Sequence, residues 1–154
     1  MRECAVSRIE IEAPVSFAVP LPSSNKLPVG WGNCAGGTVG YAIAGAAAQA
    51  SSPLLVITAD VHAATLLSEE IRFYLADPAT PILSFPDWET LPYDVFSPLP
   101  ELVSQRLLTL HQLRKLTRGV IVAPVGTLMQ RLLPAEFLEA NILLLHVGDD
   151  LDLD

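Results

Sequence analysis

The chain has 154 residues, of which 51% are hydrophobic and 17% are charged. This length fits one ordinary domain, or one domain and the beginning of a second, and the composition excludes an intrinsically disordered protein. The formal net charge of −8 argues against a general nucleic-acid-binding surface, because contacts to phosphate depend on lysine and arginine.

The chain has two cysteines, which are too few and too far apart for a disulfide framework. Neither stands at a metal-ligand spacing from a histidine, so we expect no metal site. The first 14 residues contain three glutamates, which interrupt the apolar core that a secretory signal needs. No stretch approaches the ~20 apolar residues of a membrane span. We therefore expect a cytoplasmic protein that does not contact membranes.

Residues 1–29 are interrupted by prolines and predict an irregular amino-terminal arm, with one short strand-like run at Val15–Val19. A cluster of glycines follows and leads into the alanine-rich segment YAIAGAAAQA, which has a strong helix propensity. The pattern predicts a loop that opens a helix.

An unbroken apolar run, LLVIT at Leu54–Thr58, is typical of a strand that is buried on both faces. Asp60 follows it at a position suited to cap a helix. From Val61 to about Leu75, apolar residues recur every three or four positions and charged residues stand between them. This spacing predicts an amphipathic helix.

A second short strand is predicted at Ile82–Phe85, before a proline-rich segment that must lie over the surface, since proline fits neither a helix interior nor a central strand. The clearest helix of the sequence is predicted at Glu101–Leu116. Gly119 follows closely, as is typical of a helix end.

A third strand is predicted at Val120–Ala123, and a helix from about Gly126 to Leu133. Pro134–Ala140 indicates a further helical turn, and Ile142–Val147 a last strand. Strands that alternate with helices predict an α/β fold with a mainly parallel sheet and helices on both faces. We expect three parts: the arm (1–29), the α/β domain (30–133) and the truncated start of the next domain (134–154).

The glycine loop reads GNCAGGTV from Gly32 to Val39. Compared with the phosphate-binding pattern G-x-x-x-x-G-K-[ST], Gly32 and Gly37 fall on the two glycines, and Gly36 adds a third. However, Thr38 replaces the lysine that neutralises phosphate, and Val39 replaces the residue that holds magnesium. The sequence thus predicts a P-loop-NTPase- or helicase-like domain with a degenerate phosphate loop, and weak or absent ATP binding.

Two alternatives for this loop remain open. The glycines also fit a flexible turn before an alanine-rich helix. Alternatively, the loop still binds a nucleotide or another phosphate through backbone N–H groups alone. Saturable micromolar binding of ATP analogues in a calorimetric titration would favour this second alternative.

Other candidate catalytic residues have less support. His62, His111 and His146 have no partner at a ligand spacing. Nothing fixes a separation between the carboxylates of the proline-rich segment, Asp87, Glu89 and Asp94, so we assign no catalysis to them. The aromatic residues of the same segment are expected to pin it to the domain, with contact to a partner as the second interpretation; they are Trp88, Tyr93 and Phe96.

Four basic residues gather near the end of the predicted Glu101–Leu116 helix: Arg106, Arg114, Lys115 and Arg118. We interpret them as a solvated helix end. The remaining interpretation is a module that contacts damaged DNA through the Arg106–Arg118 region. Its affinity would fall steeply with salt.

Two segments carry a resemblance to a known family. FPDWETLPYDVFSP at Phe85–Pro98 is similar to the segment that marks bacterial transcription-repair coupling factors, and RGVIVAPVGTLMQRLLP at Arg118–Pro134 resembles the same family at the same distance. We call the first ten residues of the former segment, which carry this resemblance, the family-signature segment: Phe85, Pro86, Asp87, Trp88, Glu89, Thr90, Leu91, Pro92, Tyr93 and Asp94.

The resemblance implies a large ATP-dependent DNA translocase that displaces stalled RNA polymerase and recruits the A component of the excinuclease to damaged DNA. ATP and magnesium would act in a motor that lies downstream of this chain. The amino-terminal module of the family is similar in fold to the B component of the excinuclease. This chain would then be a non-catalytic scaffold and autoregulatory platform, in contact with downstream domains of its own protein. It would meet the excinuclease A component mainly through the domain that follows.

Overall fold

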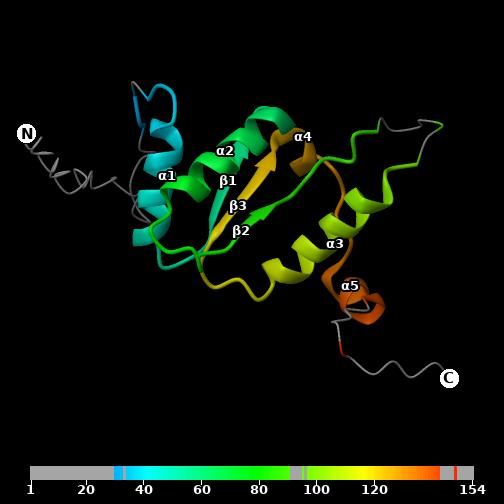
Figure 1. Ribbon diagram of the computed structural model, residues 1–154. Coiled ribbons are helices and arrows are strands. Elements are labelled where there is room, and N and C mark those ends of the chain that lie inside the picture. Colours follow the sequence, from blue (N-terminus) through cyan, green and yellow to red (C-terminus); the bar gives the residue numbers. More distant parts are fainter. Residues whose placement is uncertain (1–29, 33, 91–94, 96, 143–147, 149–154) are drawn as a thin grey trace, which may run out of the picture.

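A computed structural model of the chain describes residues 30–32, 34–90, 95, 97–142 and 148. These residues form the predicted α/β fold (Figure 1). The elements follow in the order α1 Thr38–Gln49, β1 Leu54–Thr58, α2 Val61–Tyr74, β2 Ile82–Ser84, α3 Pro100–Leu113, β3 Val120–Pro124, α4 Val125–Leu128 and α5 Ala135–Asn141.

The three described strands form one parallel sheet in the order β1-β3-β2. The central strand β3 aligns Val120 with Leu54 of β1 on one side and with Ile82 of β2 on the other. Each residue of β3 is buried, because this central strand has a neighbour on each edge and is contacted by α2 and α4. The prediction of a mainly parallel sheet is confirmed.

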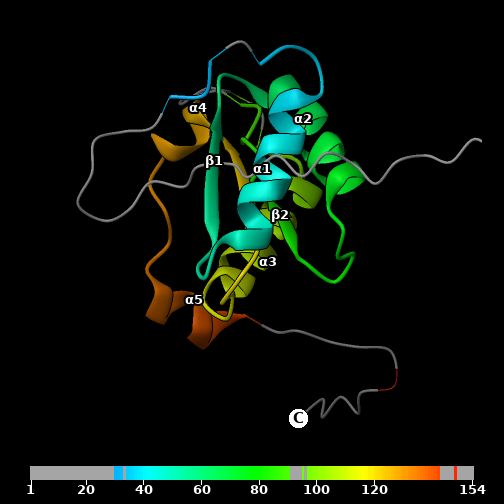
Figure 2. The ribbon, with the colours of Figure 1, turned by 90° about the vertical axis from the view of Figure 1, so that its left-hand side faces the viewer.

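Helices α1 and α2 cover one face of the sheet, and Figure 2 shows the two helices together on one side of β1. Alternate residues of the strands point into this layer, where Val120 and Val122 are fully buried. They pack with apolar side chains of the two helices to form the main core: Ile43, Ala47, Ala64 and Ile71. The predicted amphipathic helix therefore packs with its apolar stripe on the sheet.

Helix α3 packs on the opposite face, beside β2. Leu83 lies next to α3 residues, whereas its neighbour Ile82 packs against the core beneath α1 and α2. The prediction of helices on both faces is confirmed. The expectation that Leu54–Thr58 is buried on both faces is wrong for one face, since Leu55 and Ile57 of β1 keep 54% and 56% of their surface exposed where α3 does not reach.

Local sequence signals account for several element ends. The Asp60 side chain accepts a hydrogen bond from the backbone N–H of Ala63 at 2.7 Å and caps α2 as predicted. Pro100 stands in the first turn of α3, where its missing N–H costs nothing. Gly119 has a φ of +144°, and a Cβ there would lie 2.6 Å from the Pro81 carbonyl oxygen, so the turn into β3 requires glycine.

The helix predicted from about Gly126 to Leu133 is wrong beyond Leu128. Helix α4 ends after a single turn, and the next backbone hydrogen bonds join residues three apart, from Met129 to Gly126 and from Gln130 to Thr127. Met129 is 84% exposed, so the apolar pattern there has no surface to pack on. Pro134 also disfavours helical backbone at the residue before it.

The strand-like run at Val15–Val19 and residues 143–147 of the predicted last strand lie outside the described residues. In the part that the structure describes, none of the helices is long and apolar enough to cross a membrane.

Candidate functional site

The glycine loop enters α1 directly. Gly36 has a φ of +57°, a conformation that favours glycine. The Thr38 hydroxyl donates a hydrogen bond to the Ala35 carbonyl oxygen at 2.7 Å and closes the turn. The N-cap residue, Gly37, has no side chain to satisfy the first N–H groups of the helix.

The two positions that depart from a phosphate loop have local structural roles. Thr38 is exposed and its hydroxyl closes the turn on Ala35. Val39 is half-buried and packs against the core cluster. Neither side chain brings a positive charge or a metal ligand to the loop.

Helix α2 packs closely on the glycine face of α1. A Cβ at Gly40 would lie 2.5 Å from the Glu70 Cβ, and a Cβ at Gly37 would lie 2.9 Å from the Tyr74 hydroxyl oxygen. Tyr74 also makes an edge-on contact with Tyr41, with ring centroids 5.5 Å apart. At Gly40, the close atoms include the backbone of Glu70 in α2. The packing of α1 on α2 therefore requires glycine at this position, whatever the loop binds.

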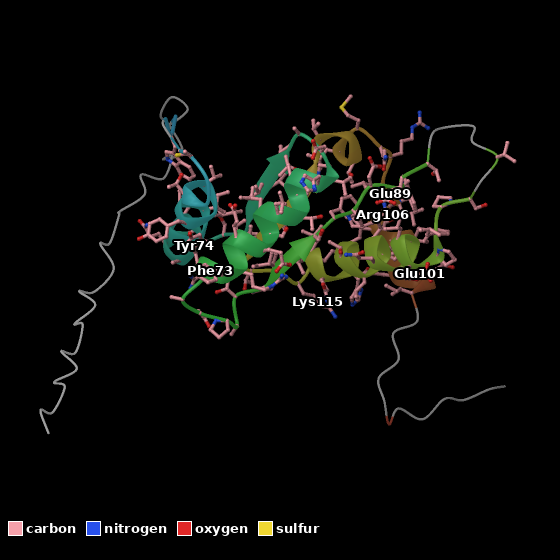
Figure 3. The ribbon with its side chains drawn as sticks, turned by 45° about the horizontal axis from the view of Figure 1, so that its top comes forward. Phe73, Tyr74, Glu89, Glu101, Arg106 and Lys115 are labelled. Atoms are coloured by element: carbon pink, nitrogen blue, oxygen red, sulfur yellow. The ribbon has the colours of Figure 1, made fainter. Side chains whose placement is uncertain are left out.

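The family-signature segment is held by a buried arginine of α3. Arg106 is only 2% exposed, and its guanidinium lies between two aromatic rings, 4.4 Å from the Phe85 centroid and 4.2 Å from the Trp88 centroid. The same group donates a hydrogen bond to the Pro86 carbonyl oxygen. Figure 3 shows Arg106 between α3 and the segment that carries Glu89. We call this arrangement of Phe85, Pro86, Trp88 and Arg106 the arginine clamp.

Further hydrogen bonds fix the segment around the clamp. Thr109 donates through its hydroxyl to the Ser84 carbonyl oxygen at 2.9 Å. The Asp87 carboxylate accepts from the Trp88 N–H at 2.7 Å and from the Gln130 side-chain amide. The segment is thus tied to α3 and to the chain after α4.

Two opposing effects act on the charge of Arg106 in the clamp. Burial lowers the pKa of Arg106 from its ordinary value, and the nearby Asp87 carboxylate acts in the opposite direction. An arginine remains protonated in either case. The two ring faces and the Pro86 carbonyl therefore stabilise a buried cation.

The structure separates the predicted site residues of this segment. Trp88 is half-buried against Arg106, which fits the expectation that aromatic side chains pin the segment. Glu89 is exposed and has a φ of +56°, whereas Asp87 is half-buried and hydrogen-bonded, so the two carboxylates have different surroundings. Four signature residues and two further candidates lie outside the described residues: Leu91, Pro92, Tyr93 and Asp94, and Phe96 and His146.

The other candidate residues do not come together. His62 is exposed on α2, and His111 lies on α3 with its Nε2 atom 3.3 Å from the Lys115 Nζ atom. Across the ranges that the structure describes, no three side chains of His, Cys, Asp or Glu form a group suited to a metal ion.

The predicted basic group is divided among separate contacts. The interpretation of a solvated helix end is wrong for Arg106, which is buried in the clamp. Arg114 forms an ion pair with Glu139 of α5. The Arg118 guanidinium donates to the Ala48 carbonyl oxygen at 3.1 Å. Of the four residues, Lys115 and Arg118 alone line a common hollow, so the group does not present one continuous cationic surface of the kind that phosphate backbones require.

Sequence reasoning missed the role of Arg106 and of Gln130. The contacts join residues 20 and 43 positions apart, and no local pattern marks either residue. Two buried atoms of the neighbourhood, Thr127 Oγ1 and Gln130 Oε1, have no hydrogen-bond partner among the described residues.

No family model matches the chain. Among curated proteins, it is 40% identical over 133 residues to a transcription-repair-coupling factor of Haemophilus influenzae, an alignment that covers 86% of this chain and 11% of that protein. It is 37% identical over 123 residues to the protein of the same name in Escherichia coli, covering 80% of this chain and 10% of that protein. Identity to the Bacillus subtilis protein is 27% over 106 residues. The chain spans about one-tenth of the length of the curated relatives it matches.

Proposed function

Since this chain is a homologue of a segment of bacterial transcription-repair-coupling factors, we propose that it serves as a non-catalytic scaffold unit in transcription-coupled DNA repair. The observation that carries the proposal is 40% identity over 86% of the chain. The arginine clamp supports it, because it gives the family-signature segment a defined base on the α/β domain.

In this proposal, the full-length protein is an ATP-dependent DNA translocase that displaces stalled RNA polymerase. Its motor lies in other parts of the molecule, and this unit supports the recruitment of the excinuclease A component and contacts downstream domains. The glycine loop is not a working ATP site in this proposal. The net charge of −8 and the dispersed arginines also favour a protein-binding role over a DNA-binding role.

A chimaera tests the proposal. The chain replaces the matching segment of the Escherichia coli relative, and the purified chimaera is assayed for release of stalled RNA polymerase and for binding of the excinuclease A component. We expect both activities at levels comparable to the parent protein. A second chimaera carries Arg106→Ala. It should lose binding of the excinuclease A component before it loses release of RNA polymerase, because the scaffold unit is loosened without the clamp.

The matched control is a chimaera with Arg131→Ala, an exposed arginine outside the clamp. A chimaera that folds, as judged by circular dichroism and gel filtration, yet neither releases polymerase nor binds the excinuclease A component would contradict the proposed role.

A further inference from the structure

A groove lies between β2 and the carboxyl-terminal half of α3. It has a volume of about 410 Å³ and a largely apolar floor, with cationic or titratable side chains at its rim. The residues that line it include Pro81, Leu83, Leu108, Leu116, His111 and Lys115. Leu108 is 41% exposed, so apolar surface is accessible here.

The groove continues around the turn before β2. A second hollow of about 310 Å³ shares Pro81, Lys115 and Leu116 with the first and adds Arg118 at its rim. Because they share these lining residues, the two hollows lie side by side. We call it the β2–α3 groove.

The charge of the groove is opposite to that of the whole chain. Among the described residues, neither Lys115 nor Arg118 forms an ion pair with a carboxylate, and Asp77 is the one acidic residue that lines the second hollow. Lys115 instead lies beside His111, and Figure 3 shows it near the end of α3, far from Glu101. On a chain with a net charge of −8, the groove is a local site for negative charge.

The backbone at the groove suits an extended ligand. Strand β2 pairs with β3 on one edge, and no described strand pairs with its other edge. Apart from the Ser84 carbonyl oxygen, which accepts from the Thr109 hydroxyl, this edge can bind an extended peptide through main-chain hydrogen bonds, with alternate side chains entering neighbouring pockets.

From these features, we propose that the β2–α3 groove binds an extended segment of a partner protein in which acidic side chains alternate with apolar ones. The apolar side chains contact Leu83, Leu108 and Leu116, and the carboxylates meet Lys115 and Arg118. Duplex DNA fits the groove less well, since two cations beside an apolar floor neutralise few phosphates. This inference does not depend on the proposed repair function, because it concerns the isolated chain.

The test uses fluorescence anisotropy with a fluorescein-labelled synthetic peptide of alternating leucine and aspartate. We expect saturable binding that weakens as salt is added. Lys115→Glu should weaken binding about fivefold or more, because it removes one ion pair and introduces a like charge. Arg131→Glu makes the same change of charge away from the groove and should leave the affinity within about twofold.

Two further measurements separate the contribution of the apolar floor of the groove from that of its charged rim. Leu108→Ser should weaken binding without changing its salt dependence, and the same peptide with asparagine in place of aspartate should bind weakly. Circular dichroism shows that each variant is folded, and Lys115→Gln replaces Lys115→Glu if the latter is not.

Four results would each overturn the proposal. The first is the absence of saturable peptide binding, and the second is equal affinity in the Lys115 and Arg131 variants. The third is tighter binding of a labelled DNA duplex than of the peptide. Tighter peptide binding by a chain ended at Gly148 would also contradict it, by showing that the chain's own acidic residues 149–154 occupy the groove.

Discussion

At the scale of single residues, Arg106 holds the family-signature segment on the α/β domain. It is a buried cation that contacts two aromatic rings and one carbonyl oxygen, all in the family-signature segment. A buried charge is costly unless such partners stabilise it, so the residue and its partners depend on one another.

We predict that Arg106→Ala lowers the free energy of unfolding by about 2–4 kcal/mol, because it removes two cation–π contacts and leaves the Pro86 carbonyl oxygen without its donor. Arg106→Lys should cost about 1–2 kcal/mol, since lysine keeps the charge but not the planar group that stacks on the rings. Urea denaturation followed by circular dichroism measures both. The exposed Arg131→Ala is the control and should change stability by about 0.5 kcal/mol or less. An equal effect of the Arg106 and Arg131 variants would show that the clamp contributes nothing.

At the scale of elements, α5 is attached to the α/β domain through α3. Leu138 is buried, with 5% of its surface exposed, near Leu107 and Ile142, and Glu139 pairs with Arg114. From the sequence, this helix is predicted to belong to the next domain, at 134–154. Its packing on α3 provides a local anchor for that boundary region.

We predict that Leu138→Ala detaches α5 and leaves the sheet intact. The loss of the buried side chain should cost about 2–3 kcal/mol locally. Hydrogen exchange of the α5 amides should then become faster, while exchange in β3 stays unchanged. Phe137→Ala is the matched control, because the neighbouring Phe137 is 55% exposed and should have a small effect. Faster exchange throughout β3 in the Leu138 variant would mean that α5 and the sheet unfold as one unit.

At the scale of the whole molecule, the two faces of the sheet differ in cover. Val56 packs in the core beneath α1 and α2, whereas Leu55 and Ile57 point to the face that α3 covers only beside β2. Parallel sheets are normally covered on both faces. In the described fold, α1 and α2 therefore close one face of the sheet, whereas the face that carries Leu55 and Ile57 is partly open.

This asymmetry predicts different costs for the same kind of substitution on one strand. Val56→Thr should lower the unfolding free energy by about 1–2 kcal/mol, because a hydroxyl enters the closed layer without a partner. Ile57→Thr should cost about 0.5 kcal/mol or less, since its side chain is already half in water and threonine keeps the β-branched shape. Denaturant titrations of the two variants give the comparison. A larger loss for Ile57→Thr would show that the open face is covered in solution.

Local patterns in the sequence determined the elements and their order. The apolar run at Leu54–Thr58, the helical spacing after Asp60 and the alternation of strands with helices each depend on neighbouring residues, so they predicted β1, α2 and the parallel sheet. The prediction was wrong at Leu128–Leu133 because it also depended on neighbouring residues alone. The apolar pattern there suggested a helix, but no surface was present to bury it.

Only the tertiary structure decided which residues hold the signature segment and where the sheet is covered. The arginine clamp joins positions 20 residues apart, the Asp87–Gln130 contact spans 43, and the closeness of Gly40 to Glu70 appears only when α1 and α2 pack. Such contacts leave no periodic signal, because they depend on the distance between elements after folding and not on the spacing of residues along the chain.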